Sequence, residues 1–261
     1  MNKHSALASI HPNAKIGKNT TIAPFAVIEA DVEIGDNCSI HSHAVVANGT
    51  RMGDNCQVFS GAIVGTIPQD LKFANEQTYL EIGNNVIIRE YCTLNKGTAA
   101  HGKTVIKDNC LLMAYSHIAH DCLVGNNCIF ANNATLGGHV EVGDFVRIGG
   151  LAAVHQFAKI GMHAFVAGGI MVRKDVPPYI KVGRESVSFI GVNSIGLQRA
   201  GYTPTQINRI KEMYSVLFVK KGYNTTKAVE YIKANIEDGE ERKNILDFIA
   251  KSERGLVKGI R

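Results

Sequence analysis

Three short polar clusters stand out in residues 118–157, because they carry side chains that can move protons. They are His120-Asp121, Gly137-Gly138-His139 and His155-Gln156, and they recur at intervals close to 18 residues. If eighteen residues make one turn of a coil, positions 120, 138 and 156 fall into one column and positions 121 and 139 into the next. Successive strands of a sheet lie about 4.8 Å apart, so His120 and Gly138 would be immediate neighbours. An imidazole beside a bare glycine backbone suggests a reaction site.

The first two clusters indicate general-base chemistry. His120 is the candidate base, since an unperturbed histidine titrates near neutral pH. Asp121 can fix the tautomer of that histidine, and the N–H of Gly138 can approach a developing oxyanion because glycine has no side chain. The sequence has no G-x-S-x-G motif and no activated cysteine. Direct transfer to an acceptor hydroxyl is therefore favoured over a covalent acyl-enzyme.

A six-residue repeat supplies the elements that must position these residues. An apolar residue opens each block in one phase, from Ile10 to Val172, with two interruptions. Glycine often follows the opener and asparagine is common at the fourth place, and both tolerate the left-handed backbone of a sharp corner. Side chains alternate along a strand, so each opener shares a face with the small residue two places before it. Short strands joined by sharp corners predict a parallel β-helix.

The repeat is interrupted twice and then gives way to helical spacing. Residues 66–79 and 97–104 lose the pattern and are expected to be external loops, where binding residues often concentrate. The paired prolines at 177–178 are expected to end the strand ladder. Residues 203–206 (TPTQ) have the form of a capping box that opens a helix, and two more helices are expected near 226–236 and 238–250. We therefore divide the chain into an all-β domain, 1–186, and a small α-helical domain, 187–261.

The composition narrows the class of protein. The 261 residues carry a net charge of +5, a mild basic excess that suits an acidic partner or phosphates, but no basic run is interleaved with aromatics, so nucleic acid is not expected. No apolar run has the ~18–20 residues that span a bilayer, and the start of the chain does not read as a signal peptide. The six cysteines all take the fifth place of a block, which elsewhere holds small residues, so they are expected to be buried free thiols. We expect a cytoplasmic protein without a transmembrane segment.

Motifs along nearly the whole chain resemble a known family. The repeat is similar to that of the hexapeptide-repeat acyltransferases, whose coils are left-handed triangular prisms that assemble as trimers. Within the repeat and the tail, six segments closely resemble the acyl-[acyl-carrier-protein]–UDP-N-acetylglucosamine O-acyltransferases, which perform the first step of lipid A synthesis: PQDLK (68–72), SHIAHDC (116–122), ANNATLGGHV (131–140), AVHQF (153–157), DVPPY (175–179) and GVN…GLQR (191–199). The resemblance implies a left-handed β-helix, a homotrimer with active sites between subunits, no cofactor or metal, and acyl carrier protein and UDP-N-acetylglucosamine as partners.

The resemblance also implies residue roles. His120 would deprotonate the 3-hydroxyl of the glucosamine, which attacks the thioester of an (R)-3-hydroxyacyl carrier protein, while Asp121 supports the base and Gly138 stabilises the oxyanion. Asn193 and Arg199 would hold the nucleotide end, where a cation suits phosphate. Gly168 matches a position that limits acyl length, and a glycine there implies a long chain. Ile195 stands where the family often has an acidic residue. The residues implied in binding the sugar nucleotide or shaping the cleft are Asp70, Lys72, His117, His139, His155 and Gln156.

Three alternatives remain open at this point. The N-acyltransferase of the same pathway shares the coil and a histidine base, but it normally carries an N-terminal domain, for which hexads beginning at Ile10 leave no room. A zinc carbonic anhydrase on the same coil would need three histidines around one metal, such as His117, His120 and His139. A non-catalytic β-helix that binds a surface would show flat threonine ladders, whereas the polar residues here are irregular and concentrated in columns.

Overall fold

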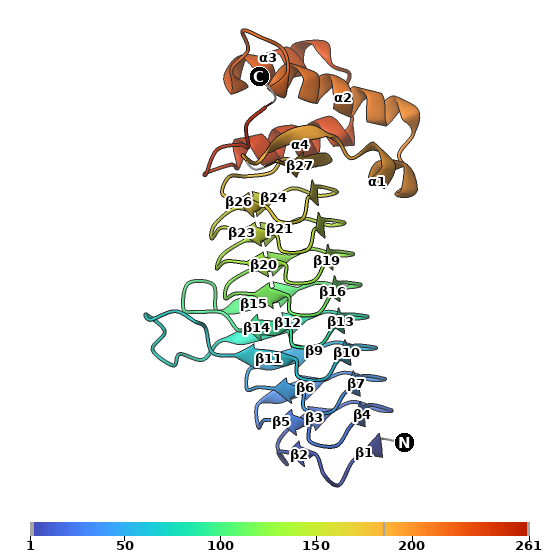
Figure 1. Ribbon diagram of the computed structural model, residues 1–261, viewed down its shortest axis with the longest axis vertical. Coiled ribbons are helices and arrows are strands. Elements are labelled where there is room, and N and C mark those ends of the chain that lie inside the picture. Colours follow the sequence, from blue (N-terminus) through green and yellow to red (C-terminus); the bar gives the residue numbers. More distant parts are fainter. Residues whose placement is uncertain (1–2, 185, 260–261) are drawn as a thin grey trace.

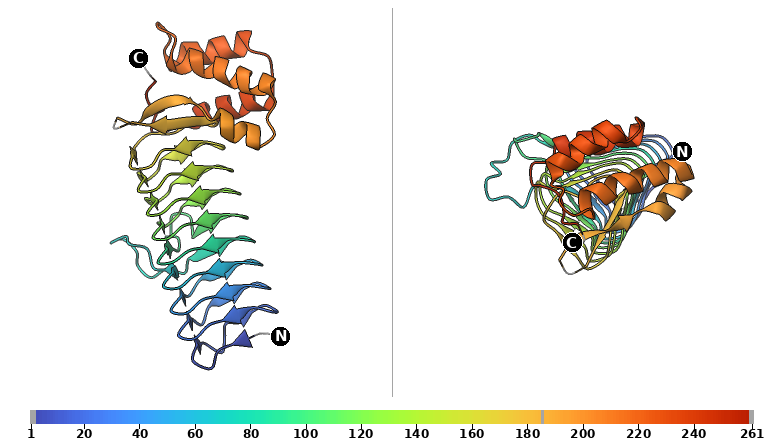
Figure 2. Two further views of the ribbon diagram at one scale, coloured as in Figure 1. Left: turned by 45° about the vertical axis from the view of Figure 1, so that its right-hand side comes forward. Right: turned by 90° about the horizontal axis from the view of Figure 1, so that it is seen from above.

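The computed structural model describes residues 3–184 and 186–259, and in it the chain forms a column of short strands capped by helices (Figure 1). Seen along its length, the column is a triangular prism, and the helices cover its C-terminal end (Figure 2). Each coil adds one strand to each of three faces, which we call sheets A, B and C. Among the described residues, every strand pair is parallel except the last hairpin of sheet A.

The three sheets contain the following strands. Sheet A has β1 (Lys3–His4), β4 (Thr21–Ile22), β7 (Ser39–Ile40), β10 (Gln57–Val58), β13 (Ile87–Ile88), β16 (Leu111–Leu112), β19 (Ile129–Phe130), β22 (Arg147–Ile148), β25 (Phe165–Val166), β27 (Ile180–Gly183) and β28 (Ser188–Val192). Sheet B has β2 (Ser9–Ile10), β5 (Val27–Ile28), β8 (Val45–Val46), β11 (Ile63–Thr66), β14 (Thr93–Asn95), β17 (His117–Ile118), β20 (Thr135–Leu136), β23 (Ala153–Val154) and β26 (Met171–Val172). Sheet C has β3 (Lys15–Ile16), β6 (Val32–Ile34), β9 (Thr50–Met52), β12 (Tyr79–Ile82), β15 (Lys103–Ile106), β18 (Leu123–Val124), β21 (Glu141–Val142) and β24 (Lys159–Ile160).

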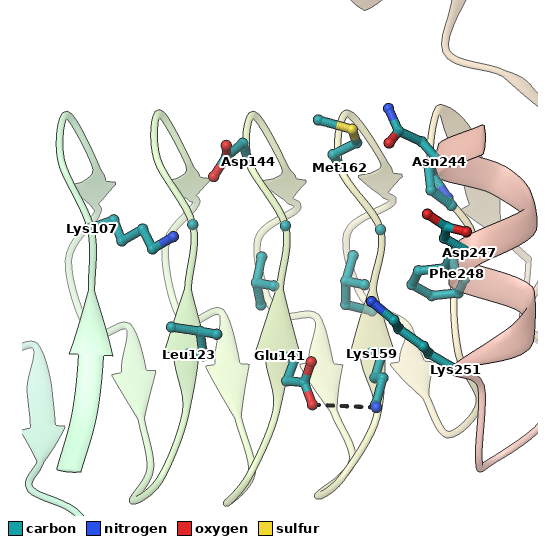
Figure 3. Close-up of a pocket in the computed structure, with 16 residues that line it drawn as sticks. Lys107, Leu123, Glu141, Asp144, Lys159, Met162, Asn244, Asp247, Phe248 and Lys251 are labelled. Carbon is teal, nitrogen blue, oxygen red and sulfur yellow. Dashed lines mark ion pairs between the residues drawn. The ribbon is translucent and has the colours of Figure 1, made fainter. Parts of the chain in front are cut away.

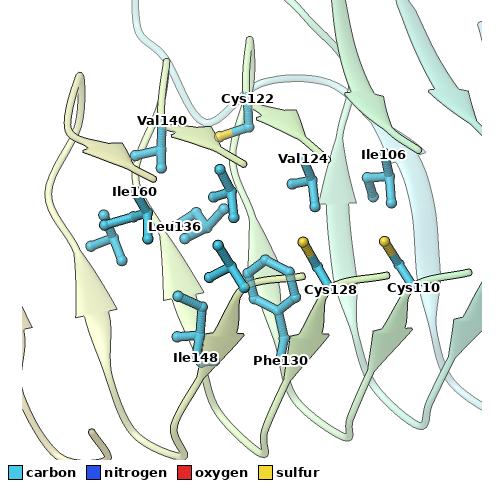
Figure 4. Packing of buried hydrophobic residues seen from close by; sticks show 14 of the residues in the cluster. Ile106, Cys110, Cys122, Val124, Cys128, Phe130, Leu136, Val140, Ile148 and Ile160 are labelled. Carbon is cyan, nitrogen blue, oxygen red and sulfur yellow. The ribbon is translucent and has the colours of Figure 1, made fainter. Parts of the chain in front are cut away.

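The six-residue period sets both the register and the core. His117 of β17 pairs with Thr135 of β20, so a regular coil takes eighteen residues. The openers, such as Phe130 and Leu136, point into the prism and are fully buried, because successive side chains of a strand face opposite sides (Figure 4). The cysteines fill the small places between them, and all six are buried and free, which confirms the expectation for them.

Most corners of the prism contain one residue with left-handed backbone. On the edge where sheet C leads to sheet A, the C–A edge, this conformation is taken mainly by asparagines such as Asn127 (φ 58°). On the edge between sheets B and C, the B–C edge, it is taken by Asp121, His139 and Phe157 (φ 60°, 60° and 64°). The A–B edge instead carries Phe25, Tyr91, Tyr115 and Leu151, among others. The titratable residues of the candidate site therefore lie on the B–C edge, and the A–B edge carries mainly large apolar side chains.

Two coils are longer than eighteen residues, and their extra residues leave the prism as loops at the B–C edge. The loops cover residues 67–78, between β11 and β12, and residues 96–102, between β14 and β15. They project together from the side of the column in Figure 1. Thr66 and Tyr79, at the ends of the first expected loop, are already paired within sheets B and C.

The prediction that the paired prolines end the strand ladder is wrong. Val176 still bridges Ile160 of β24, and β27 then pairs in parallel with β25. Pro177 and Pro178 lie at the C–A corner between these two pairings, where a residue without an N–H removes no ladder hydrogen bond. The coil ends one strand later, when β28 folds back antiparallel to β27.

The helical tail follows the expected signals with one addition. The helices are α1 (Ser194–Arg199), α2 (Pro204–Phe218), α3 (Thr225–Asn235) and α4 (Glu240–Ala250). The capping box is confirmed, since Thr203 and Gln206 bond reciprocally at the start of α2. The short α1, capped by the side chain of Asn193, was not expected. Over the described residues, every helix is too short or too polar to cross a bilayer.

Candidate functional site

The three polar clusters meet at the B–C edge in successive coils, as the eighteen-residue spacing predicted. The N–H of His139 donates to the carbonyl of His120 at 3.0 Å, and the N–H of Phe157 donates to the carbonyl of Gly138 at 3.0 Å. Positions 120, 138 and 156 therefore form one column of corner residues, and positions 121, 139 and 157 form the next.

The imidazole of His120 packs against the bare backbone of Gly138. A Cβ atom built on Gly138 would lie 2.7 Å from both Cε1 and Nε2 of His120, so only glycine leaves room for the ring in this position. The His120 side chain is 14 % exposed, enough for a substrate to reach it. Within the described part of the chain, we find no hydrogen bond made by the N–H of Gly138, which leaves that donor free for a ligand.

A buried carboxylate holds the histidine. Nδ1 of His120 lies 2.8 Å from Oδ2 of Asp121, whose side chain is fully buried. Asp121 also accepts hydrogen bonds from the N–H of Thr98 at 3.0 Å and from its hydroxyl at 2.7 Å. Burial would raise the pKa of Asp121, but the bonds from His120 and Thr98 outweigh it and hold that pKa below its usual value. The carboxylate therefore stays charged and orients His120 with its Nε2 toward the column of Gly138.

Thr98 belongs to the candidate site through its contact with Asp121, and the sequence analysis missed it. It lies in the loop 96–102, and it reaches Asp121 only because that loop folds back along the B–C edge. The hydroxyl of Thr104, in the strand after the loop, accepts a bond from the backbone N–H of Asp121 at 2.8 Å. No spacing rule links positions 98 and 121, so the repeat alone offered no signal for this contact.

His139 extends the cluster on the side of the loops. Its Nε2 lies 3.8 Å from Oδ2 of Asp121, and its ring stacks on Phe157 with centroids 4.5 Å apart. The ring of His101, from the loop 96–102, meets it edge-on at 5.3 Å. Burial lowers the pKa of His139, although the nearby charges of Asp121 and Asp70 act in the opposite direction. Asp70, from the first loop, is therefore near enough for its charge to act on His139.

The remaining residues expected around the sugar lie on the rim of the same edge. The N–H of Lys72 donates to Oδ1 of Asp70 at 3.0 Å, and the Lys72 side chain is exposed. His117 is half-buried in β17, three residues before His120, and shares a 2.7 Å hydrogen bond with the Thr93 hydroxyl. Burial, together with the nearby His120, lowers the pKa of His117. The side chains of His155 and Gln156 are exposed one coil beyond Gly138.

Asn193 and Arg199 lie elsewhere in the chain. They line a groove of about 880 Å³ between α1 and sheet A, the face opposite the B–C edge. Its floor carries two cations that the sequence analysis did not single out, Arg147 of β22 and Lys181 of β27. Ile195 lies in the same groove with its side chain exposed. Within one chain, the expected nucleotide-binding residues do not meet the candidate base.

Two further positions are separate from the B–C edge. Gly168 is exposed at the A–B edge, where a Cβ atom would lie 2.8 Å from the carbonyl oxygen of Gly150. A second groove, of about 380 Å³, lies between sheet C and α4 (Figure 3). Glu141 and Lys159 form an ion pair across neighbouring strands in this groove, at 3.4 Å. In the described chain, none of the residues predicted for the site lines this second groove.

The cluster at the B–C edge has the parts of an acyl-transfer site without a side-chain nucleophile. A histidine base held by a charged carboxylate lies beside a free backbone N–H, which is the pairing that deprotonates a hydroxyl and stabilises an oxyanion. Burial raises the pKa of Cys122, the thiol nearest to this pair in sequence, to about 12, so it remains protonated and unreactive. Donor atoms of His120, Asp121 and His139 lie within 4.8 Å of one another, a set that differs from the three histidines of the carbonic anhydrase alternative.

Comparisons with known proteins agree with this geometry. A family model described as Udp N-acetylglucosamine O-acyltransferase, domain 2, matches residues 175–257, and one described as bacterial transferase hexapeptide (six repeats) matches residues 13–48 and 103–138. The acyl-[acyl-carrier-protein]–UDP-N-acetylglucosamine O-acyltransferase of Paracidovorax citrulli is 47% identical over 263 residues, which cover 99% of this chain and 100% of that protein. The enzyme of the same name from Xylella fastidiosa is 41% identical over 266 residues, with coverage of 99% and 100%.

Solved structures extend the likeness to the fold. The crystal structure of a UDP-N-acetylglucosamine acyltransferase from Bacteroides fragilis matches with a TM-score of 0.95 and 42% identity, over 97% of this chain and 99% of that one. The fold class expected from the sequence, a left-handed parallel β-helix followed by a small helical part, is therefore confirmed. A relative that is identical at nearly half of all positions over its full length leaves no doubt about kinship: the chain belongs to the family of acyl-[acyl-carrier-protein]–UDP-N-acetylglucosamine O-acyltransferases.

Proposed function

We propose that this chain transfers an (R)-3-hydroxyacyl group from acyl carrier protein to the 3-hydroxyl of UDP-N-acetylglucosamine, the first step of lipid A biosynthesis. The observation that carries the proposal is the contact between the ring of His120 and the backbone of Gly138. This contact supports the proposal, because a base at His120 and an oxyanion donor at Gly138 would both reach a single reacting centre. The names of the relatives supply the two substrates.

In the proposed reaction, Nε2 of His120 takes the proton of the sugar 3-hydroxyl as its oxygen attacks the thioester carbonyl. The N–H of Gly138 donates to the oxyanion that forms, and Asp121 stabilises the imidazolium. Collapse of this intermediate breaks the C–S bond and forms the ester. The thiolate of the carrier's prosthetic group leaves and takes up the proton from His120. No acyl-enzyme is needed.

We further propose that the active form is a homotrimer built on the A–B edge. Five coils place a large apolar side chain on that edge, each between 54 % and 71 % exposed in the single chain: Leu7, Phe25, Tyr91, Tyr115 and Leu151. A ladder of exposed apolar residues along one edge is typical of a subunit contact. Three prisms that meet at this edge around a three-fold axis would bury it.

The trimer would also explain why the expected site residues lie apart in one chain. When three triangular prisms meet at their A–B edges, sheet A of one subunit faces sheet B of the next. The groove with Asn193 and Arg199, on sheet A, would then open toward the B–C edge of the neighbour, where His120 lies. Asp70, Lys72, His117, His139, His155 and Gln156 would line the sugar side of that shared cleft. Gly168, near the seam between subunits, would leave room for a long acyl chain.

The direct test is acylation of UDP-N-acetylglucosamine by the purified chain with a series of (R)-3-hydroxyacyl carrier proteins, followed by mass spectrometry of the product. We expect a 3-O-acyl product, with the longest chains preferred.

Replacing His120 by alanine should lower the rate about 10²–10⁴-fold, since a positioned base contributes this much. The exposed His11, near the N-terminal end of the column, provides a control as His11→Asn. If the chain instead acylates the free amine of the 3-O-acyl, deacetylated derivative of UDP-N-acetylglucosamine, the N-acyltransferase alternative is favoured.

A further inference from the structure

We propose that His120, Asp121 and His139 also form a binding site for a transition-metal cation such as Zn²⁺, and that metal bound there blocks the catalytic base. The site goes beyond the proposed acyl transfer, which needs no metal to bring base, oxyanion donor and hydroxyl together. Its inhibitory consequence rests on the proposed role of His120, but the binding itself does not.

The donor set is close to what such a cation requires. Nδ1 of His120 and Oδ2 of Asp121 are 2.8 Å apart, and Nε2 of His139 lies 3.8 Å from the same oxygen. In a tetrahedral zinc site, ligand atoms about 2.0–2.1 Å from the metal are separated by about 3.3 Å from one another. Small rotations of the two rings would therefore convert the cluster into a two-histidine, one-carboxylate site.

The surroundings of the cluster support a metal site more than a chance gathering of polar groups. The carboxylate of Asp121 is fully buried and charged, so it attracts a cation strongly. Thr98 binds both of its oxygens, in the way that outer groups fix the ligands of metal sites. His101 meets His139 edge-on from the loop, so its imidazole is a candidate for a fourth ligand. Imidazole and carboxylate together suit Zn²⁺.

Metal at this place would disable His120 through its tautomer. A neutral imidazole carries one proton, and as a base His120 keeps it on Nδ1, facing Asp121, with the lone pair of Nε2 toward the substrate. Coordination of Nδ1 requires that proton to move to Nε2. The nitrogen that should accept the hydroxyl proton then carries one already, so acyl transfer stops while the sugar nucleotide can still bind its other contacts.

Binding can be measured without activity. Zinc affinity of the purified full-length chain is determined by competition with a chromophoric chelator, and Co²⁺ is used as a spectroscopic probe for four-coordinate geometry. We expect one metal per chain. Asp121→Asn and His139→Asn should each weaken binding by at least about tenfold, and Thr98→Val by about 10–100-fold, as is typical for an outer group. Both asparagine variants suit the left-handed backbone at these positions, so folding is preserved.

Activity then tests the consequence. In buffer with chelator, the His101→Asn variant should have the same turnover rate as the unmodified chain. When zinc is added in place of the chelator, the variant should need a higher zinc concentration for half-inhibition. His11→Asn, near the N-terminal end of the column, should change neither quantity. Metal affinity that is unchanged in Asp121→Asn and His139→Asn would overturn the site. If the chain transfers acyl groups but binds no zinc, the metal site is overturned and the proposed function stands. If the chain binds zinc in a way that depends on Asp121 but transfers no acyl group, the proposed function is overturned and the metal site stands.

Discussion

The ring of His120 rests on the backbone of Gly138, in the next coil of the prism, so closely that a methyl group at position 138 would lie 2.7 Å from both Cε1 and Nε2. The contact arises because eighteen residues return the chain to the same corner one strand higher. A glycine is required here by the neighbouring ring of His120 and not by a left-handed backbone, since Gly138 is absent from the residues with positive φ.

Replacing Gly138 by alanine should therefore damage catalysis more than stability. The added methyl group has to push the imidazole out of line with the backbone N–H at 138, so we expect kcat to fall by at least about 10²-fold, the range for losing an oxyanion donor or a positioned base. The matched control is Gly102→Ala in the nearby loop, where a Cβ meets nothing within 4 Å but φ is +71°. That variant should lose about 1–2 kcal/mol of stability and retain activity. Equal activity of the two variants would contradict the argument.

Replacing Asp121 by asparagine removes the charge that orients His120. The side-chain volume hardly changes, and asparagine tolerates the left-handed backbone at this corner. The amide can hold the imidazole in the wrong tautomer, so kcat should fall by about 10²–10⁴-fold with little change in KM. Thr98→Val leaves the carboxylate charged and deprives it of one hydrogen bond, so its effect on kcat should be smaller. Steady-state kinetics of both variants, with circular dichroism as the test of folding, decide the point. A larger loss in Thr98→Val than in Asp121→Asn would mean that the loop matters more than the charge.

Periodicity alone predicted the β-helix and the column that joins His120 to Gly138, because both follow from counting eighteen residues. It could not predict contacts made by residues outside the repeat. Thr98 reaches Asp121 through the folding of a loop, and loop paths depend on tertiary contacts that leave no period in the sequence. The groove with Arg147 and Lys181 exists because α1 packs beside sheet A. The prediction that Pro177 and Pro178 end the ladder failed because a proline fits at a corner, and the sequence does not show where the strand before it ends.

Arg199 should act on binding of the nucleotide and hardly on chemistry. It lies at the end of α1 in a groove whose other cations are Arg147 and Lys181, a combination suited to a diphosphate. Arg199→Ala should raise KM for UDP-N-acetylglucosamine by about 10–100-fold and leave kcat within a few-fold. Arg199→Lys should recover only part of the loss, because an ammonium cannot bind two oxygens as a guanidinium does. Lys211→Ala, an exposed change on α2 outside the groove, is the control. A large drop in kcat alone would point to a role near the reacting atoms.

The proposed trimer makes a separate prediction at the A–B edge. Leu151 is 71 % exposed in the single chain, and Leu151→Asp would bring three carboxylates together at the axis. We expect monomers in sedimentation velocity and loss of acyl transfer, because the two halves of the cleft belong to different subunits. Val219→Asp places the same charge on an apolar residue of the helical tail and should leave the trimer intact. An active Leu151→Asp monomer would show that one chain contains the whole site.

Complementation tests the sharing of the cleft directly. His120→Ala chains are inactive, and Arg199→Ala chains are weak when UDP-N-acetylglucosamine is far below their raised KM, so the assay is run at that low concentration. When the two are co-expressed, some clefts combine an intact His120 from one subunit with an intact Arg199 from its neighbour. Random assembly at equal amounts restores about a quarter of the sites in a cyclic trimer. Activity should therefore rise well above that of either variant. Absence of any recovery in mixed trimers would place both residues of one site on the same chain.

His163 should make the fold sensitive to acid. Its ring is 6 % exposed and stacks on Phe145 with centroids 4.7 Å apart, while Tyr179 lies on its other side at 5.9 Å. Burial lowers the pKa of His163, and the charge of Arg147 adds to this effect, whereas Asp144 opposes it. A folded pKa below the unfolded value of about 6.5 means that the unfolded chain binds the proton more readily. Stability is therefore complete above that value and decreases as the pH falls toward the folded pKa.

The variant that isolates this contribution is His163→Phe. Phe145 and Tyr179 occupy the same C–A corner one coil away on either side with φ of 60° and 68°, so an aromatic residue without a titrating group fits the backbone at 163, where φ is 55°. We expect equal or higher stability at pH 7.5. Below about pH 6.5, the dependence of the unfolding free energy on pH should weaken by up to one proton, about 1.4 kcal/mol per pH unit. Urea unfolding at pH 5.5, 6.5 and 7.5 measures this change. The half-buried His117 and His139 remain in the variant, so a reduced slope is expected and not its disappearance. An unchanged slope would show that the pKa of His163 is the same in the folded and the unfolded chain.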